Sequence, residues 1–111
     1  MSGQRERSAS FEELPDARAR VTGSLGFSSV GALLAEGDAA IRGGRASVID
    51  LAGVTDSDSS ALALLIEWLS VAKEAHHPLR YENMPSQLRQ LARLSDVEEL
   101  LMPRTEGAAS T

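Results

Sequence analysis

The chain has 111 residues, a formal net charge of -5 and an isoelectric point of about 4.9. This length is typical of one compact domain with one core, which removes roughly two thirds of the unfolded surface from water. The acidic balance disfavours nucleic acid and anionic lipid as partners, and the absence of Cys excludes disulfides, thiolate chemistry and Cys-based zinc sites.

The two ends of the chain differ from its middle. Apart from Met1, residues 1–8 and 105–111 are polar or small, so we expect a disordered tail and a flexible tail around a single domain of residues 9–104. The N-terminus lacks the apolar segment of a secretory signal, and the longest near-apolar run is far short of the ~20 residues that cross a bilayer. These features predict a cytoplasmic protein without direct membrane insertion.

The first predicted elements are two strands. Apolar and polar residues alternate over residues 17–25, which is the period of a half-buried strand. Residues 8–14 are expected to pair with this strand through a turn at Pro15 and Asp16.

Residues 30–42 are predicted to form the first helix, with Ser28 or Ser29 as the N-cap because a serine oxygen can accept from a free first-turn N–H. Gly37 lies in the middle of this helix and costs about 1 kcal/mol of helix propensity, so we expect another backbone to come close to it. The inward face is expected to hold Leu33, Leu34, Gly37, Ala40 and Ile41.

A strand and a long helix follow. Residues 46–51 are short, β-branched and largely apolar, as in a central strand covered by helices. Residues 60–75 give the strongest helix pattern in the chain, and Leu64, Trp68 and Val71 widen its apolar side on one flank. That flank either lies under a neighbouring helix, which we place first, or contacts a partner.

The last elements are shorter. Residues 79–82 are predicted to form a strand, and Pro85 suits the first position of a helix that ends near Arg93. Ser95 and Glu98 have the spacing of a capping box at the start of a final short helix. Strands that alternate with helices indicate an α/β fold, with a mixed sheet covered mainly on one face.

Five consecutive polar residues lie between the central strand and the first turn of the long helix. We call Asp56, Ser57, Asp58, Ser59 and Ser60 the polar segment. Asp58 or Ser59 can cap the helix, but capping needs only one such residue. A helix N-terminus also favours anions, although Asp56 and Asp58 would repel one. A serine here could instead be phosphorylated, which would add about -1.5 to -2 charge.

The stretch "VIDLAGVTDSDSSALALL" resembles the signature of the STAS domain family, which includes anti-sigma factor antagonists and modules of sulfate transporters. The resemblance extends over most of the chain, from Ala17 to Arg104. It implies a four- or five-stranded mixed sheet with helices packed on one side. The acidic and hydroxyl pair of the family matches Asp58 and Ser59, with Ser60 as the next candidate for phosphorylation.

Within this family, "DSSALALLIEWLSVAKE" is most similar to the MlaB-like STAS subunits of phospholipid ABC transporters that maintain outer-membrane lipid asymmetry in Gram-negative bacteria. This resemblance implies a protein without catalytic activity or cofactors, which binds the transporter ATPase, with two copies of each per complex, and reaches the inner membrane through that complex. Ala61 replaces the Gly common in regulatory members, which weakens the case for a phosphorylation switch.

Several kinds of chemistry lack the residues they require. Gly43, Gly44 and Arg45 do not form a phosphate-binding G-x-x-x-x-G-K-[ST] loop. His76 and His77 are adjacent and would point in different directions, so a solvated turn is the better interpretation than a metal site. No G-x-S-x-G elbow surrounds the serines, and a catalytic pair of Asp56 and Asp58 is less common than surface acids.

The leading hypothesis is therefore a non-enzymatic subunit that docks on the ATPase of a phospholipid ABC transporter. Its partner-binding residues would be the polar segment, with Ser59 at the centre, and the flank residues Leu64 and Trp68. Two alternatives stay open: an anti-sigma factor antagonist that is phosphorylated on Ser59 or Ser60, and a small-ligand binder that uses the helix N-terminus.

Overall fold

Residues 9–102 of the chain are described by a computed structural model. The predicted tails at residues 1–8 and 105–111, and the domain boundary at residue 104, lie outside this range. The described elements alternate between strands and helices as expected, and they are β1 (Ala9–Leu14), β2 (Arg18–Leu25), α1 (Val30–Arg42), β3 (Val48–Ser57), α2 (Ser59–Ala75), β4 (Arg80–Glu82), α3 (Ser86–Leu94) and α4 (Glu98–Leu101).

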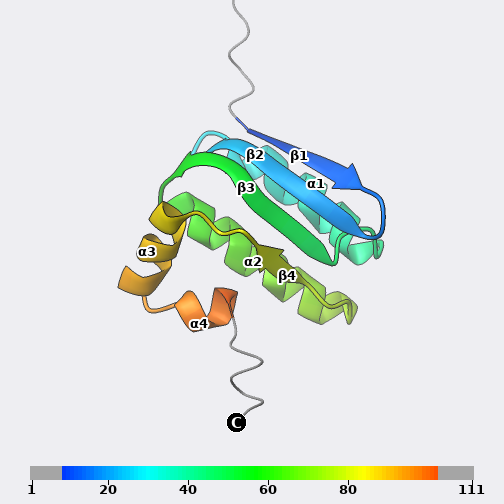
Figure 1. The fold of residues 1–111 in the computed structure, drawn as a ribbon. Coiled ribbons are helices and arrows are strands. Elements are labelled where there is room, and N and C mark those ends of the chain that lie inside the picture. Colours follow the sequence, from blue (N-terminus) through cyan, green and yellow to red (C-terminus); the bar gives the residue numbers. More distant parts are fainter. Residues whose placement is uncertain (1–8, 103–111) are drawn as a thin grey trace, which may run out of the picture.

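The described strands form one mixed sheet in the order β1-β2-β3-β4. β1 and β2 are antiparallel, whereas β3 runs parallel to both β2 and β4. Figure 1 shows α1 and α2 side by side behind the sheet, with α3 and α4 next to α2. The predicted α/β fold, with a mixed sheet and helices mainly on one face, is confirmed.

The core lies between the sheet and the two long helices. Alternate residues of the strands point into it and are buried, because side chains along a strand alternate between its two faces. α1 and α2 close this layer from the other side. The largest fully buried side chains include Leu25, Leu33, Ile41, Ile49, Leu51, Leu65 and Trp68.

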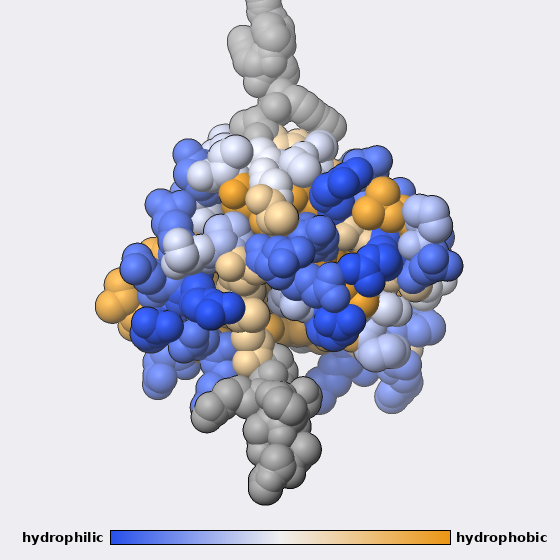
Figure 2. All heavy atoms as spheres, in the orientation of Figure 1, coloured by the Kyte–Doolittle hydropathy of each residue, from blue (hydrophilic) through white to orange (hydrophobic). Residues whose placement is uncertain are grey.

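The outer face of the sheet is polar. Ser10 and Thr22 are hydrogen bonded across β1 and β2 at 3.0 Å, and Arg20 forms an ion pair with Glu12 at 3.0 Å. Figure 2 shows this side of the molecule covered mostly by hydrophilic residues. The central strand was expected to be covered by helices, and in β3 Ile49, Leu51 and Val54 are buried whereas Asp50 and Ala52 are not.

The hairpin between β1 and β2 turns through a strained backbone. Leu14 pairs with Arg18, so Pro15, Asp16 and Ala17 make the connection, and the turn predicted at Pro15 and Asp16 is confirmed. Asp16 and Ala17 have φ of 66° and 57°, which is the left-handed region that disfavours residues with a Cβ.

We expect Ala17→Gly to raise the free energy of unfolding by about 0.5–1 kcal/mol, because relief of the left-handed strain exceeds the entropy that glycine adds to the unfolded chain. Urea unfolding would measure the change. The same substitution at exposed Ala35 in α1 is the control, and it should lower stability by about 1 kcal/mol. A loss at position 17 equal to that at position 35 would contradict the strain.

Helix α1 has the predicted bounds, but its first turn lacks the predicted serine cap. Ser29 occupies the N-cap position without a side-chain cap bond. Its hydroxyl accepts from the Gly26 N–H at 3.0 Å and donates to the Ser24 carbonyl at 2.9 Å. Capping by Ser28 or Ser29 was therefore a wrong prediction, because this hydroxyl binds the preceding loop instead of the first turn.

The C-terminal helices also start differently from their prediction. Pro85 is the N-cap of α3 rather than its first residue, since its ψ of 151° is extended. The capping box of Ser95 and Glu98 is absent, because Ser95 is the C-cap of α3 and α4 begins only at Glu98. The Glu98 carboxylate lies 3.4 Å from the Arg93 guanidinium instead.

Gly37 is required by a side chain and not, as expected, by another backbone. A Cβ on this residue would lie 2.2 Å from Cε2 of Trp68, and the indole of Trp68 packs between α1 and the sheet. Its Nε1 donates to the Leu34 carbonyl of α1 at 3.3 Å, and its ring meets Phe11 of β1 edge to face with centroids 5.6 Å apart.

We therefore expect Gly37→Ala to lower the free energy of unfolding by about 1–3 kcal/mol through overpacking, although alanine is the better helix former by ~1 kcal/mol. Gly31→Ala is the matched control in the same helix, because its Cβ would meet nothing within 4 Å. Chemical denaturation of both variants measures the difference. Equal stability of the two variants would show that the indole can move aside.

Candidate docking site

The polar segment lies where β3 ends and α2 begins. Asp58 is the single residue between the two elements and has an extended backbone, with φ of -126° and ψ of -169°. Its Oδ1 accepts from the Ser60 N–H at 2.8 Å, which satisfies one of the free donors of the first turn. Of the two predicted caps, Asp58 is confirmed.

Asp58 also holds the loop between β2 and α1. Its backbone N–H donates to the Leu25 carbonyl at 3.1 Å, and its Oδ2 accepts from the Phe27 N–H at 3.4 Å. The loop is therefore fixed beside the start of α2. The Phe27 side chain is 85% exposed, so this arrangement presents an aromatic ring to solvent next to the polar segment.

Asp56 and Ser57 belong to β3 and not to a loop. Asp56 pairs with Ser24 and Ser57 with Leu25, after irregularities in the register between β2 and β3. The Ser24 hydroxyl donates to Asp56 Oδ1, and the Ser57 N–H donates to Oε1 of Gln87 at 3.2 Å. The predicted strand end at residue 51 was therefore wrong, because pairing with β2 continues to Ser57.

The serines at the start of α2 differ in exposure. Ser59 is the first residue of the helix and is exposed, whereas Ser60 is half-buried. Asp56 and Asp58 are exposed as well, and Ser57 is half-buried. The structure therefore brings the predicted polar residues together on an accessible surface.

The two apolar residues of the predicted site lie deeper. Trp68 has no exposed surface, because α1 covers this flank of α2. From the sequence, the flank could have faced either a neighbouring helix or a partner. The neighbouring-helix interpretation is confirmed, and the assignment of Trp68 as a residue that contacts a partner is wrong. Leu64 is 3% exposed, but it lines a groove that opens on the surface between the two helices.

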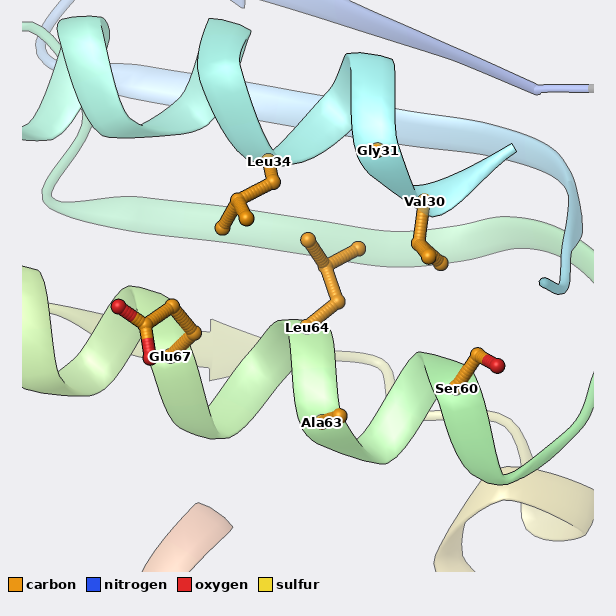
Figure 3. Close-up of a pocket in the computed structure, with 7 residues that line it drawn as sticks. All are labelled: Val30, Gly31, Leu34, Ser60, Ala63, Leu64 and Glu67. Carbon is orange, nitrogen blue, oxygen red and sulfur yellow. The ribbon is translucent and has the colours of Figure 1, made fainter. Parts of the chain in front are cut away.

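This groove, which we call the α1–α2 groove, has a volume of about 350 Å³. In Figure 3 Val30 and Leu34 point from α1 toward α2, and Leu64 points back toward α1 between them. The groove stays open because two of its lining positions are the small residues Gly31 and Ala63. Its lining consists of Val30, Gly31, Leu34, Ser60, Ala63, Leu64 and Glu67.

Sequence reasoning missed Phe27 and most of the groove. A large aromatic residue between Gly26 and Ser28, in a segment that belongs to no strand or helix, was an available signal for an exposed ring. The small residues Gly31 and Ala63 were visible too, but only the packing of α1 on α2 brings them together.

A second depression lies on the other side of Asp58, at the carboxyl ends of β2 and β3. It has a volume of about 340 Å³ and is lined by Ser24, Leu25, Gly26, Asp56, Ser57, Asp58 and Gln87. Its charged side chains are both carboxylates, so it does not suit the phosphate or other anion that a helix N-terminus attracts. The small-ligand hypothesis gains no support from it.

Residues 9–102 contain no cluster of three or more His, Asp or Glu side chains that could hold a metal ion. In the same part of the chain no helix has the length and hydropathy needed to span a membrane.

Comparisons with known proteins agree with this architecture. The model of the family described as "Mlab, STAS domain" matches residues 11–103. No protein of curated function matches the sequence.

Among solved structures, the chain is similar to the anti-sigma factor antagonist SpoIIAA in its unphosphorylated form, with 21% identity, a TM-score of 0.66, and coverage of 90% of this chain and 92% of that chain. It is also similar to the phosphorylated form of SpoIIAA, described as a Bacillus cell fate determinant, with 17% identity, a TM-score of 0.63, and coverage of 91% and 96%. Identities this low show a shared fold alone. The family match, which spans nearly all of the described residues, shows that the chain belongs to the MlaB-like STAS domain family.

Proposed function

We propose that this protein is a non-catalytic subunit that binds and supports the ATPase of an ABC transporter moving phospholipids to maintain outer-membrane lipid asymmetry. The observation that carries the proposal is one accessible surface at the start of α2. There the exposed Ser59 lies beside the α1–α2 groove and the exposed ring of Phe27. The match to the MlaB-like family supports the choice of partner.

In this role the protein works in the cytoplasm and reaches the inner membrane through its partner complex. Since ABC ATPases act as dimers, we expect two copies of this chain per complex. The contact combines an apolar centre, formed by the groove and Phe27, with hydroxyl and carboxylate groups around it. Such a distribution is typical of protein–protein interfaces, in which apolar anchors lie inside a polar rim.

A second candidate function is that of an anti-sigma factor antagonist controlled by serine phosphorylation. The exposure of Ser59 at the first position of α2 favours it, because a kinase could reach this hydroxyl. Against it, Asp58 already accepts from the Ser60 N–H, so a phosphate on Ser59 would lie next to a carboxylate and find this helix donor already bound.

The experiment that tests the proposal is purification of the tagged full-length chain from its native cells, followed by mass spectrometry. Stoichiometric recovery of an ABC transporter ATPase, with Ser59 and Ser60 unmodified, is the expected result. Recovery of a serine kinase, together with stoichiometric phosphate on Ser59 or Ser60, would replace the transporter role with the antagonist role.

A further inference from the structure

Charge is distributed unevenly along the elements that surround the α1–α2 groove. Residues 30–41 of α1 and 59–72 of α2 contain no Lys or Arg, whereas they contain Glu36, Asp38 and Glu67; of these, Asp38 is paired with Arg42 at the end of α1. Glu67 lines the groove directly, and Asp58 is the N-cap of α2, one of the two helices that line it.

The groove itself is apolar. Val30, Leu34 and Leu64 converge in it (Figure 3), and Phe27 stands exposed in the loop just before α1. An apolar centre with a carboxylate in its lining, Glu67, and no Lys or Arg in that lining is complementary to a segment that carries apolar side chains on one face and positive charge beside them.

We infer that the α1–α2 groove binds a basic amphipathic helix of the partner protein, with an apolar side chain seated against Leu34 and Leu64 and a Lys or Arg facing Glu67. This inference rests on the proposed function, because it takes that partner to be the transporter ATPase. It specifies the chemistry that the ATPase must present to this chain.

Other occupants fit this surface less well. A second copy of the chain would bring Glu67 of one groove against Glu67 of the other, since a two-fold interface uses the same patch twice. An anionic membrane surface would be repelled in the same way. The chain's own residues 1–8 and 103–111 hold one large apolar side chain, Met1, so neither segment supplies an apolar helix face.

Trp68 provides a direct measurement of binding. It is the only Trp of the chain and its indole binds the Leu34 carbonyl, so its emission reports on the packing beneath the groove. The probe is a Trp-free helical peptide of leucine and lysine, with leucine on one face, titrated into the full-length protein. The matched peptide carries glutamate in place of lysine.

We expect saturable binding of the lysine peptide and none of the glutamate peptide. Glu67→Lys should weaken the lysine peptide at least about tenfold, as reversal of a facing charge does. Glu99→Lys in α4, which changes the net charge equally, should leave the affinity unchanged. Ala63→Arg, which fills the groove, should abolish binding. Equal weakening by Glu67→Lys and Glu99→Lys, or equal binding of both peptides, would overturn the inference.

Co-purification with the ATPase separates this inference from the proposed function. If the ATPase stays bound to Glu67→Lys and Ala63→Arg, the groove assignment fails and the transporter role stands. If the peptide results hold but no ATPase accompanies the wild-type chain, the groove assignment stands for a different basic partner and the transporter role fails.

Discussion

Trp68→Ala is expected to lower the free energy of unfolding by about 3–5 kcal/mol, the usual cost of removing a large buried aromatic side chain. The indole has no exposed surface and touches three elements: Gly37 and Leu34 of α1, Phe11 of β1, and its own helix α2. Its loss leaves a cavity between α1 and α2, and it removes the hydrogen bond to the Leu34 carbonyl.

Urea unfolding followed by far-UV circular dichroism measures this effect, because the variant has no tryptophan emission. Trp68→Phe is the control that keeps most of the apolar contact but loses the Nε1 donor, and it should cost clearly less than the alanine variant. A domain of this size has about 5–15 kcal/mol of stability, so the alanine variant stays folded without denaturant if the wild type lies above the lower end of this range. A loss below about 1 kcal/mol would show that the ring does not fix α1 on α2.

Ser59→Arg is expected to abolish co-purification of the chain with its proposed partner, the transporter ATPase, while the fold stays intact. Ser59 is exposed at the first position of α2, so the longer side chain can extend into solvent without disturbing the core. At a docking surface the same side chain occupies the space of the partner, and its positive charge opposes the basic segment expected there.

The measurement is co-purification from cells that express both proteins, with thermal unfolding of the isolated variant as the check on folding. Ser95→Arg at the C-cap of α3 is the matched control, because Ser95 is also exposed and the change in charge is identical. It should retain the ATPase. Normal recovery of the ATPase with Ser59→Arg would reject the start of α2 as the contact.

Periodic patterns predicted the parts of the fold that depend on local sequence. The helical pattern gave α1 its observed bounds and α2 to within one residue, since an amphipathic stripe and its flanking turns are encoded nearby. The strand β3 was predicted too short, because Gly53 and Asp56 are poor strand formers. Its length is decided by hydrogen bonding to β2, whose residues lie about thirty positions away.

In the candidate site, too, local features could be predicted from the sequence and features that depend on distant residues could not. An unusual density of Asp and Ser marked the polar segment, and the structure places these residues on an accessible surface. Whether Trp68 faced a helix or a partner could not be predicted, because it depends on Gly37, which makes room for the indole from the other helix. The α1–α2 groove likewise depends on the close packing of two helices that are distant in sequence.

The parallel pairing of β2 with β3 has a consequence for how fast the chain reaches its native state. Ala19 lies opposite Ile49 and Gly23 opposite Val54, so the centre of the sheet forms only after the whole segment containing α1 has closed into a loop. Loop-closure entropy is lost before those contacts are gained, which slows folding relative to a helical bundle of the same size. We expect folding to take ~milliseconds or longer. The hairpin of β1 and β2 can form early, whereas the pairing of β2 with β3 forms in the rate-limiting step.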